Sequence, residues 1–298
     1  MDARPEGFDL LVAVFKKRTG IDLSAYKERQ MIRRLTSYLR RVDAPSFAVL
    51  ASRIARDDAA LQHLKDYITI NVSEFFRNPD RYEALEREIL PALFQEFGTL
   101  RIWSAGCSIG AEPYSLSILL EELDPKTPHR ILATDVDVKA LEVAKAGIYN
   151  EDKLKEVSSQ RLRRFFTREE ADKWRVAPEI KRRVRFQVHD LLKDPYPVGQ
   201  HLILCRNVVI YFVDEAKEEV FRKLAEALVE GGYLMIGSTE SIFRPERYGL
   251  QAVGSFVYRK MKKGGVLGVA RDRAFSPSSA GRFEAGGRSF VGAGREAF

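Results

Sequence analysis

A glycine turn between an expected strand and an expected helix carries the clearest chemistry in this chain. The apolar run 100–104 is typical of a short strand, and Gly106 and Gly110 follow it before a helix predicted over 112–123. Glycine lets the backbone approach a ligand closely, and the first turn of a helix offers N–H groups without partners inside the helix. The turn therefore predicts a ligand-binding loop.

An acidic residue at the end of the next expected strand, 130–134, strengthens this prediction. Asp135 would lie at the carboxyl end of that strand, where ligands of open α/β sheets bind, near the point where the strand order reverses. A carboxylate there can hydrogen-bond both hydroxyls of a ribose. An ordinary turn with a solvated aspartate is the alternative, but the glycine turn and the acid together favour a nucleoside site.

The spacing and charge of the loop indicate which nucleoside it holds. A dinucleotide site is expected to carry G-x-G-x-x-G and a pyrophosphate at the helix end, whereas Gly106 and Gly110 are spaced G-x-x-x-G. Glu112 at the helix start would repel a pyrophosphate and attract an ammonium or sulfonium group. S-adenosylmethionine carries both cations and no phosphate. The loop therefore favours this cofactor over NAD, with S-adenosylhomocysteine as its product.

Three further segments carry polar groups whose roles the composition leaves open. The segment 71–77 (NVSEFFR) is typical of a linker with a buried Phe pair and a solvated Arg77. Asp190, which follows another expected strand, could accept the adenine amino group or cap a helix. The segment 205–212 (CRNVVIYF) also follows an expected strand. It lacks the Asn/Asp-Pro-Pro-Tyr/Phe motif of base-methylating enzymes, which argues against a nucleic-acid methyltransferase.

Composition excludes several classes of protein. The net charge of +7 and the pI of about 9.3 favour an anionic partner. No run of about 18 apolar residues is present, so no membrane insertion is expected. Two cysteines, Cys107 and Cys205, indicate a reduced cytoplasmic setting rather than a disulfide framework, and Cys107 is expected to be the more exposed. The four histidines lack metal-ligand spacing, so we expect no metal.

The order of expected elements predicts two kinds of structure. Apolar spacing before residue 70 predicts helices only, with Gly20 as a stop and Ser24 as a candidate N-cap. From residue 100, strands alternate with helices, which is typical of a mostly parallel α/β sheet. We expect a helical domain (1–70), a linker with a connecting helix (71–98), an α/β domain (99–261) with a subdomain inserted at about 149–183, and a disordered tail (262–298).

One predicted helix, 27–42, is strongly basic. Apolar residues form one stripe along it, and the arginines recur seven residues apart on the remaining faces. A solvated helix face is the alternative, but the regular spacing favours a surface that docks an acidic partner. The helix lacks the interleaved aromatics of a nucleic-acid site, so no nucleic-acid partner is expected. The candidate docking residues are Arg29, Arg33, Arg34, Arg40 and Arg41.

Four motifs, in this order, resemble the chemotaxis receptor methyltransferases, the CheR family. They are NVSEFFR, WSAGCSIGAEPYS, TDVD and CRNVVIYF, and GSTE at 237–240 stands where the family has G-H-S-E. The resemblance covers about 8–260. It implies a Rossmann-like, doubly wound S-adenosylmethionine methyltransferase domain after a helical N-terminal domain, with a small inserted β-subdomain. It also implies methyl ester formation on glutamates in the methylation-region helices of bacterial chemoreceptors, and we expect a monomer.

The resemblance also implies roles for single residues. Glu112 would hold the methionine ammonium and Asp135 the ribose, Tyr211 would lie near the transferred methyl group, and Arg77 is suited to orient a carboxylate through its planar fork. The cofactor-binding set that follows from the resemblance is Asn71, Ser73, Arg77, Gly106, Glu112, Asp135, Asp190, Leu191, Arg206 and Asn207.

Two departures and one rival function follow from the same comparison of motifs. Ser73 stands where the family usually has Thr, and Asp190 where some relatives have Asn. The inserted subdomain lacks the glycine-rich loop of relatives that bind a receptor's C-terminal pentapeptide, so we expect no such tether. The rival function is a non-catalytic adaptor that senses S-adenosylmethionine on signalling arrays. Intact Arg77, Glu112 and Tyr211 argue against it.

Overall fold

The N-terminal part of the chain is helical, as predicted. The computed structural model describes residues 4–69, 73–170 and 172–262, so Asn71 and residues 263–298 of the predicted tail lie outside it. Leu11, Phe15, Leu35 and Ile54 are fully buried in one shared core. The four helices are α1 (Phe8–Thr19), α2 (Glu28–Arg41), α3 (Phe47–Arg56) and α4 (Asp58–Ile68).

The connection between α1 and α2 differs from the prediction. Gly20 ends α1 in the left-handed conformation, as expected. Ser24, however, does not cap α2, because it lies in a 3₁₀ turn (Leu23–Ala25) in which Asp22 accepts a hydrogen bond from its backbone N–H. Tyr26 follows in an extended conformation, and α2 begins only at Glu28. A short strand-like segment therefore precedes the basic helix.

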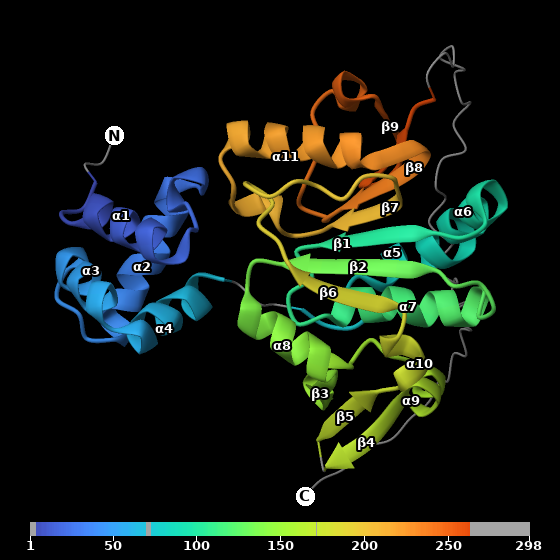
Figure 1. The fold of residues 1–298 in the computed structure, drawn as a ribbon, viewed down its shortest axis with the longest axis horizontal. Coiled ribbons are helices and arrows are strands. Elements are labelled where there is room, and N and C mark those ends of the chain that lie inside the picture. The colour runs from blue at the N-terminus through green and yellow to red at the C-terminus, as the bar shows by residue number, and fades with distance from the viewer. Residues whose placement is uncertain (1–3, 70–72, 171, 263–298) are drawn as a thin grey trace, which may run out of the picture. The chain divides into compact units, whose positions relative to one another are not determined.

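The rest of the chain is built on a seven-stranded sheet in the order β6-β2-β1-β7-β8-β10-β9 (Figure 1). The first five strands are parallel, and β10 runs antiparallel to both of its neighbours. The order reverses between β1 and β7, which is where ligands bind in such sheets. The strands are β1 (Arg101–Ala105), β2 (Arg130–Asp135), β6 (Val184–Val188), β7 (Gln200–Cys205), β8 (Leu228–Ile236), β9 (Leu250–Gly254) and β10 (Val257–Lys260).

Helices cover both faces of this sheet, which explains its continuous apolar strands. Successive side chains of a strand point to opposite faces. Ile102 packs in the core that contains helices α6 and α7, whereas its neighbour Trp103 packs in the core that contains α11. Figure 1 shows α11 and α7 on opposite sides of the sheet. The helices are α5 (Pro79–Ala84), α6 (Leu90–Phe97), α7 (Ala111–Leu123), α8 (Val138–Ala146) and α11 (Asp214–Ala227), with a π-helical turn (Leu85–Ile89) between α5 and α6.

An inserted β-subdomain lies between β2 and β6 in the sequence, as the resemblance implies. Its strands form a separate antiparallel sheet in the order β3-β5-β4. Within the described residues, no helix has the length and apolarity needed to cross a membrane. The elements of the subdomain are β3 (Ile148–Asn150), a 3₁₀ turn (Glu151–Lys153), α9 (Ser159–Phe165), β4 (Phe166–Glu170), β5 (Lys173–Val176) and α10 (Pro178–Lys181).

Candidate functional site

A cavity of about 690 Å³ lies at the carboxyl ends of the parallel strands. The segments that follow β1, β2, β6 and β7 all line it, which is the position expected for a ligand at the switch point. Its volume is in the range of small-molecule and cofactor sites. Most of the predicted cofactor set lies along its walls: Ser73, Arg77, Gly106, Glu112, Asp135, Asp190, Leu191, Arg206 and Asn207.

The glycine turn is shaped by packing as well as by its exposure to the cavity. Gly106 has a φ of 78°, and a Cβ at this position would come within 2.4 Å of the Val208 side chain. Only glycine therefore allows the loop after β1 to lie against the loop after β7. Cys107, expected to be exposed, is buried against Ala133 and Leu141 of the adjacent elements. Burial raises the pKa of its thiol, so it is unsuited to act as a nucleophile.

Glu112 lies in the first turn of α7 and is held by two donors. The Ser104 hydroxyl donates to its Oε1 at 2.8 Å, and the Arg206 guanidinium donates to its Oε2 at 3.3 Å. Burial raises the pKa of Glu112, and the charge of Arg206 opposes that shift. A carboxylate has about four acceptor positions. Acceptor capacity therefore remains for a cation in the cavity.

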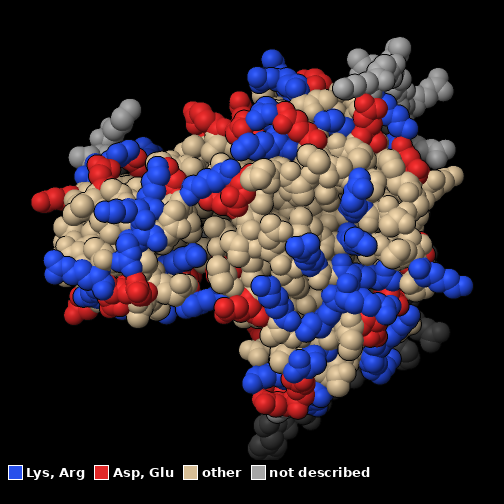
Figure 2. Space-filling model, in the orientation of Figure 1, with Lys and Arg blue, Asp and Glu red and all other residues tan. Residues whose placement is uncertain are grey.

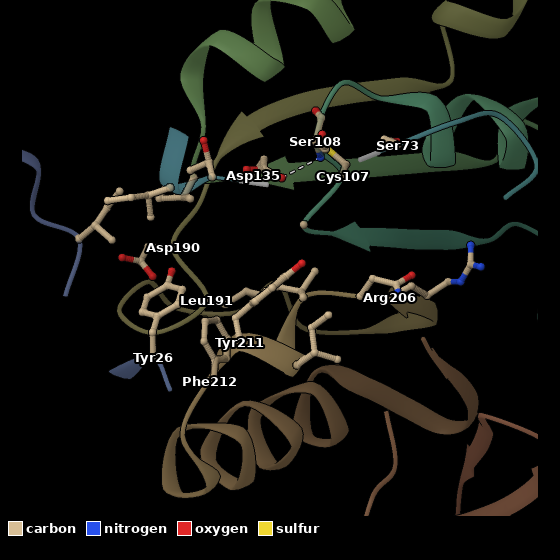
Figure 3. A pocket seen from close by; sticks show the side chains of 18 of the residues that line it. Tyr26, Ser73, Cys107, Ser108, Asp135, Asp190, Leu191, Arg206, Tyr211 and Phe212 are labelled. Atoms are coloured by element: carbon tan, nitrogen blue, oxygen red, sulfur yellow. Dashed lines mark hydrogen bonds between the residues drawn. The ribbon is translucent and has the colours of Figure 1, made fainter. Parts of the chain in front are cut away.

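Asp135 ends β2 and is oriented by backbone donors. The N–H of Ser108 donates to Oδ2 at 2.7 Å, and the N–H of Asp137 donates to Oδ1 at 2.9 Å. Figure 3 shows the first of these bonds between the loops that follow β1 and β2. Burial raises the pKa of Asp135, and the backbone donors oppose that shift. The two bonds fix the plane of the carboxylate against the glycine loop and leave a second lone pair on each oxygen.

Arg206 joins the segment 73–78 to the core of the site. One terminal nitrogen donates to the carbonyl of Arg77 at 2.8 Å and to the side-chain oxygen of Asn78 at 2.9 Å. Its Nε is buried and has no hydrogen-bond partner among the residues that the structure describes. A buried donor of this kind needs an acceptor. Arg206 therefore keeps one buried donor without an acceptor among the described residues, next to Glu112.

Glu240 is a residue of the site that the sequence analysis quoted without assigning a role. Its side chain is buried and accepts hydrogen bonds from the backbone N–H groups of Asn207, Val208 and Gly237. Asn207 has a φ of 60°, in the left-handed region that asparagine adopts more readily than most other residues. Glu240 thus holds the loop after β7 in a left-handed turn. Its motif at 237–240 was the only sequence signal for this.

Asp190 and Leu191 lie at the opposite end of the cavity from Arg206 (Figure 3). Asp190 accepts a bond from the Leu192 N–H at 2.9 Å, and the Lys193 ammonium lies 3.5 Å from its other oxygen. The turn-capping and ligand-facing interpretations of Asp190 are therefore compatible. The residue caps its own turn and also lines the cavity.

Arg77 and Tyr211 both line the cavity. Tyr211 lies in the 3₁₀ turn Val209–Tyr211 that follows the loop after β7. Partial burial raises the pKa of the Tyr211 phenol, and the positive charges of Arg34 and Arg77 oppose that shift. The hydroxyl of Tyr211 is therefore neutral at physiological pH and lies in the field of two guanidinium groups. A region of this kind attracts an anion.

The arginines predicted for docking lie in different environments. Arg33 and Arg34 line the cavity, whereas Arg29, Arg40 and Arg41 do not. Arg34 donates to the backbone carbonyl of Tyr67 at 2.9 Å and lies over its ring, with 5.0 Å from Cζ to the centroid. Arg41 also lies over the Tyr67 ring, with 5.9 Å from its Cζ to the centroid. Arg34 is thus partly committed to the packing of α2 on α4.

Two family models match consecutive parts of the chain. The model described as "CheR methyltransferase, all-alpha domain" matches residues 6–69, and "CheR methyltransferase, SAM binding domain" matches residues 71–269. The chain belongs to the CheR methyltransferase family. The predictions of a methyltransferase and of S-adenosylmethionine as its cofactor are thereby confirmed, and the adaptor alternative is not favoured.

Individual relatives in this family match most of the chain. A chemotaxis protein methyltransferase of Listeria monocytogenes is 41% identical over 248 residues, which are 83% of this chain and 94% of that protein. Chemotaxis protein methyltransferase 1 of Pseudomonas aeruginosa is 33% identical over 87% of this chain and 99% of its own length. A chemotaxis protein methyltransferase of Borreliella burgdorferi is 31% identical over 78% of this chain and 87% of its own length.

Proposed function

We propose that this protein transfers the methyl group of S-adenosylmethionine to glutamate side chains of bacterial chemoreceptors and forms methyl esters. The observation that carries the proposal is that one cavity gathers Glu112 and Asp135 together with Arg77 and Tyr211. The first two suit the cofactor, and the second two suit an anionic acceptor. Relatives named chemotaxis protein methyltransferase support chemoreceptors as the substrate class.

The walls of the cavity fit an elongated, zwitterionic nucleoside. Glu112 and the guanidinium of Arg206 form a matched pair for the ammonium and carboxylate of the methionine part. Asp135 accepts hydrogen bonds from the ribose hydroxyls, and Asp190 and Leu191 flank the adenine. Ser73 and Asn207 complete the walls, and Asn71 is proposed from the resemblance alone. When bound, the cofactor supplies a methyl group on a sulfonium, which is already electrophilic.

The acceptor needs little activation by the protein. A glutamate carboxylate is ionised at neutral pH, so no general base is required. The guanidinium of Arg77 orients the carboxylate, and the Tyr211 hydroxyl positions it close to the sulfonium. Catalysis then consists of positioning and of excluding water around a weak nucleophile. A strong bond from Arg77 also lowers the nucleophilicity of the carboxylate, so orientation is its main contribution.

The basic helix α2 is the proposed docking surface for the receptor. Arg29, Arg33, Arg40 and Arg41 are exposed on it, and Arg33 also reaches the cavity. Figure 2 shows basic side chains on the helical part, with acidic ones between them, so the attraction is local rather than uniform. An acidic helical bundle such as a receptor methylation region fits this stripe. We propose no tether through the β-subdomain, and a monomer as the active form.

The direct test combines purified protein, methyl-tritiated S-adenosylmethionine and a candidate receptor. The proposal predicts label on the receptor that mild base releases as volatile methanol, because glutamyl esters hydrolyse under conditions that leave methylated amines intact. Asp135→Asn is the matched variant, because it keeps the size of the side chain and loses its charge, and it should label the receptor more slowly. Base-stable label would contradict ester formation.

A further inference from the structure

Several residues of the helical domain line the cavity, although the predicted cofactor-binding set came only from the linker and the methyltransferase domain. Tyr26 lies in the extended segment between the 3₁₀ turn at Leu23–Ala25 and helix α2, and it lines the cavity. It was neither a candidate site residue nor part of any motif. Figure 3 shows Tyr26 beside Asp190 and Leu191, at the end of the pocket away from Arg206.

The position of Tyr26 is fixed by a two-sided backbone pairing. The N–H of Lys27 donates to the carbonyl of Tyr211 at 2.8 Å, and the N–H of Val213 donates to the carbonyl of Ala25 at 2.9 Å. Tyr26 and Phe212 form an antiparallel β-bridge between these bonds. Their rings pack edge to face, with centroids 5.2 Å apart and an interplanar angle of 84°. The side chain therefore has little freedom to leave the cavity wall.

The Tyr26 hydroxyl is placed to bind a ligand rather than another residue. In the part of the chain that the structure describes, the Tyr26 hydroxyl forms no hydrogen bond to another residue, and the Tyr26 side chain is half-buried in the cavity wall. Burial raises the pKa of the Tyr26 phenol, and the negative charges of Asp190 and Asp135 raise it further. The hydroxyl thus stays protonated near two carboxylates. It is a donor in the neighbourhood of two carboxylates, which only accept.

We propose that Tyr26 is a cofactor-binding residue supplied by the helical domain. Its ring closes the adenosine end of the cavity, and its hydroxyl donates a hydrogen bond to an oxygen or ring nitrogen of the adenosine. Asp135 and Asp190 accept bonds from the ligand's own donors, so the three side chains together match a group that both donates and accepts. This inference takes the identity of the ligand from the proposed function. It does not depend on which protein accepts the methyl group.

The test is calorimetric binding of two ligands to the full chain. S-Adenosylhomocysteine contains both ends of the ligand, and 5′-methylthioadenosine keeps the adenosine end without the amino-acid group. Tyr26→Phe should weaken both by about 3- to 10-fold, which is the loss of one hydrogen bond. Tyr26→Ala should weaken both by about 10- to 100-fold, because the ring contact is lost as well.

Two matched variants make the result specific. Tyr67→Phe removes a hydroxyl from the same domain outside the cavity and should leave both affinities unchanged. Glu112→Gln should weaken S-adenosylhomocysteine but not 5′-methylthioadenosine, because its partner is the ammonium group. Circular dichroism and thermal melting check that each variant folds. If Tyr26→Ala does not fold, Tyr26→Phe decides, because it keeps the packing on Phe212.

The outcomes separate this inference from the proposed function. Tyr26 variants that bind both ligands within about twofold of the unaltered protein would overturn the inference, as would a loss confined to S-adenosylhomocysteine. Failure of the unaltered protein to bind S-adenosylhomocysteine would overturn both proposals. Binding that depends on Tyr26, in a protein that methylates no receptor glutamate, would support the inference and contradict the proposed substrate.

Discussion

At the scale of single residues, opposite charges are arranged along one cavity. Glu112 and Arg206 pair at one end of the cavity. Towards the other end, Asp135 and Asp190 form no ion pair with a described residue that lines the cavity. Lys193 approaches Asp190 only at 3.5 Å, from its own turn. The charge of Arg77 acts on both Tyr211 and Glu112, but the proposed mechanism assigns Arg77 to the acceptor carboxylate and the acidic residues to the cofactor. This separation predicts different effects for substitutions at the two kinds of residue.

Arg77→Ala should lose most of the turnover with only a modest loss of cofactor affinity. The guanidinium orients the acceptor carboxylate in the proposed mechanism, and its removal leaves the Glu112 and Asp135 contacts in place. We expect kcat to fall by about 100-fold or more, the scale on which misplaced reactants lose rate. Kinetics with receptor and calorimetry with S-adenosylhomocysteine measure the two effects. A collapse of cofactor affinity at unchanged kcat would make Arg77 a binding residue instead.

At the scale of elements, the start of β1 depends on two neutral imidazoles. The Leu100 N–H donates to Nδ1 of His129 at 3.1 Å, and the Arg101 N–H donates to Nδ1 of His201 at 2.8 Å. Both histidines are buried. Burial lowers the pKa of both imidazoles below 6.5, despite the carboxylate of Asp124 beside His129. The central strand is therefore built on acceptors that must remain unprotonated.

Stability should consequently fall as the pH falls from 7 to 5.5. Below about 6.5 the unfolded chain binds more protons on these histidines than the folded chain does, so protons favour unfolding. The loss of stability cannot exceed about 1.4 kcal/mol per pH unit for each imidazole. Urea unfolding at several pH values measures it. His129→Asn with His201→Asn keeps an acceptor at each position without the titration, and an equally steep pH dependence in this double variant would refute the assignment.

The sequence predicted the elements better than the contacts between them. Apolar runs located β1, β2 and β7, because parallel strands inside a sheet are buried on both faces. Strand β9, which exposes its central residues, was missed. Tyr26 was missed because its neighbours fit a helix start, and only the pairing with Tyr211–Val213 makes it extended. Glu240 was missed because its partners are backbone groups of a loop far away in sequence.

Some features of the chain stay predictions from the sequence. The domain boundaries at 70, 98 and 261 stay predictions, as do the disorder of the tail and the monomeric state. Asn71 lies outside the described residues, and its role as a cofactor ligand stays a prediction from the resemblance.

At the scale of the whole molecule, the position of the basic residues matters more for receptor docking than the net charge does. The chain carries a formal net charge of +7, but basic side chains also lie outside α2, for example on α9. A receptor that recognises α2 should respond to charge reversal there and not elsewhere. Arg33 and Arg40 are exposed and seven residues apart, which makes them the appropriate pair to change.

Arg33→Glu with Arg40→Glu should raise the KM for receptor more than it lowers kcat. Each exposed contact contributes up to about 1 kcal/mol, so reversal of two should raise KM by about 10-fold or more at low salt and less at high salt. Arg163→Glu with Arg164→Glu in α9 makes the same change in net charge away from α2 and should alter KM little. Equal effects of the two pairs would remove α2 as the docking surface.

The central claim is that the methyl group is carried by a glutamate side chain of a chemoreceptor. Tandem mass spectrometry of a receptor incubated with the protein and S-adenosylmethionine tests it most directly. The account predicts a mass increase of one methylene unit on specific glutamates of the methylation helices, absent when the cofactor is omitted and reduced with Asp135→Asn. The same increase on lysine, arginine or a chain terminus, or on no receptor residue, would contradict it.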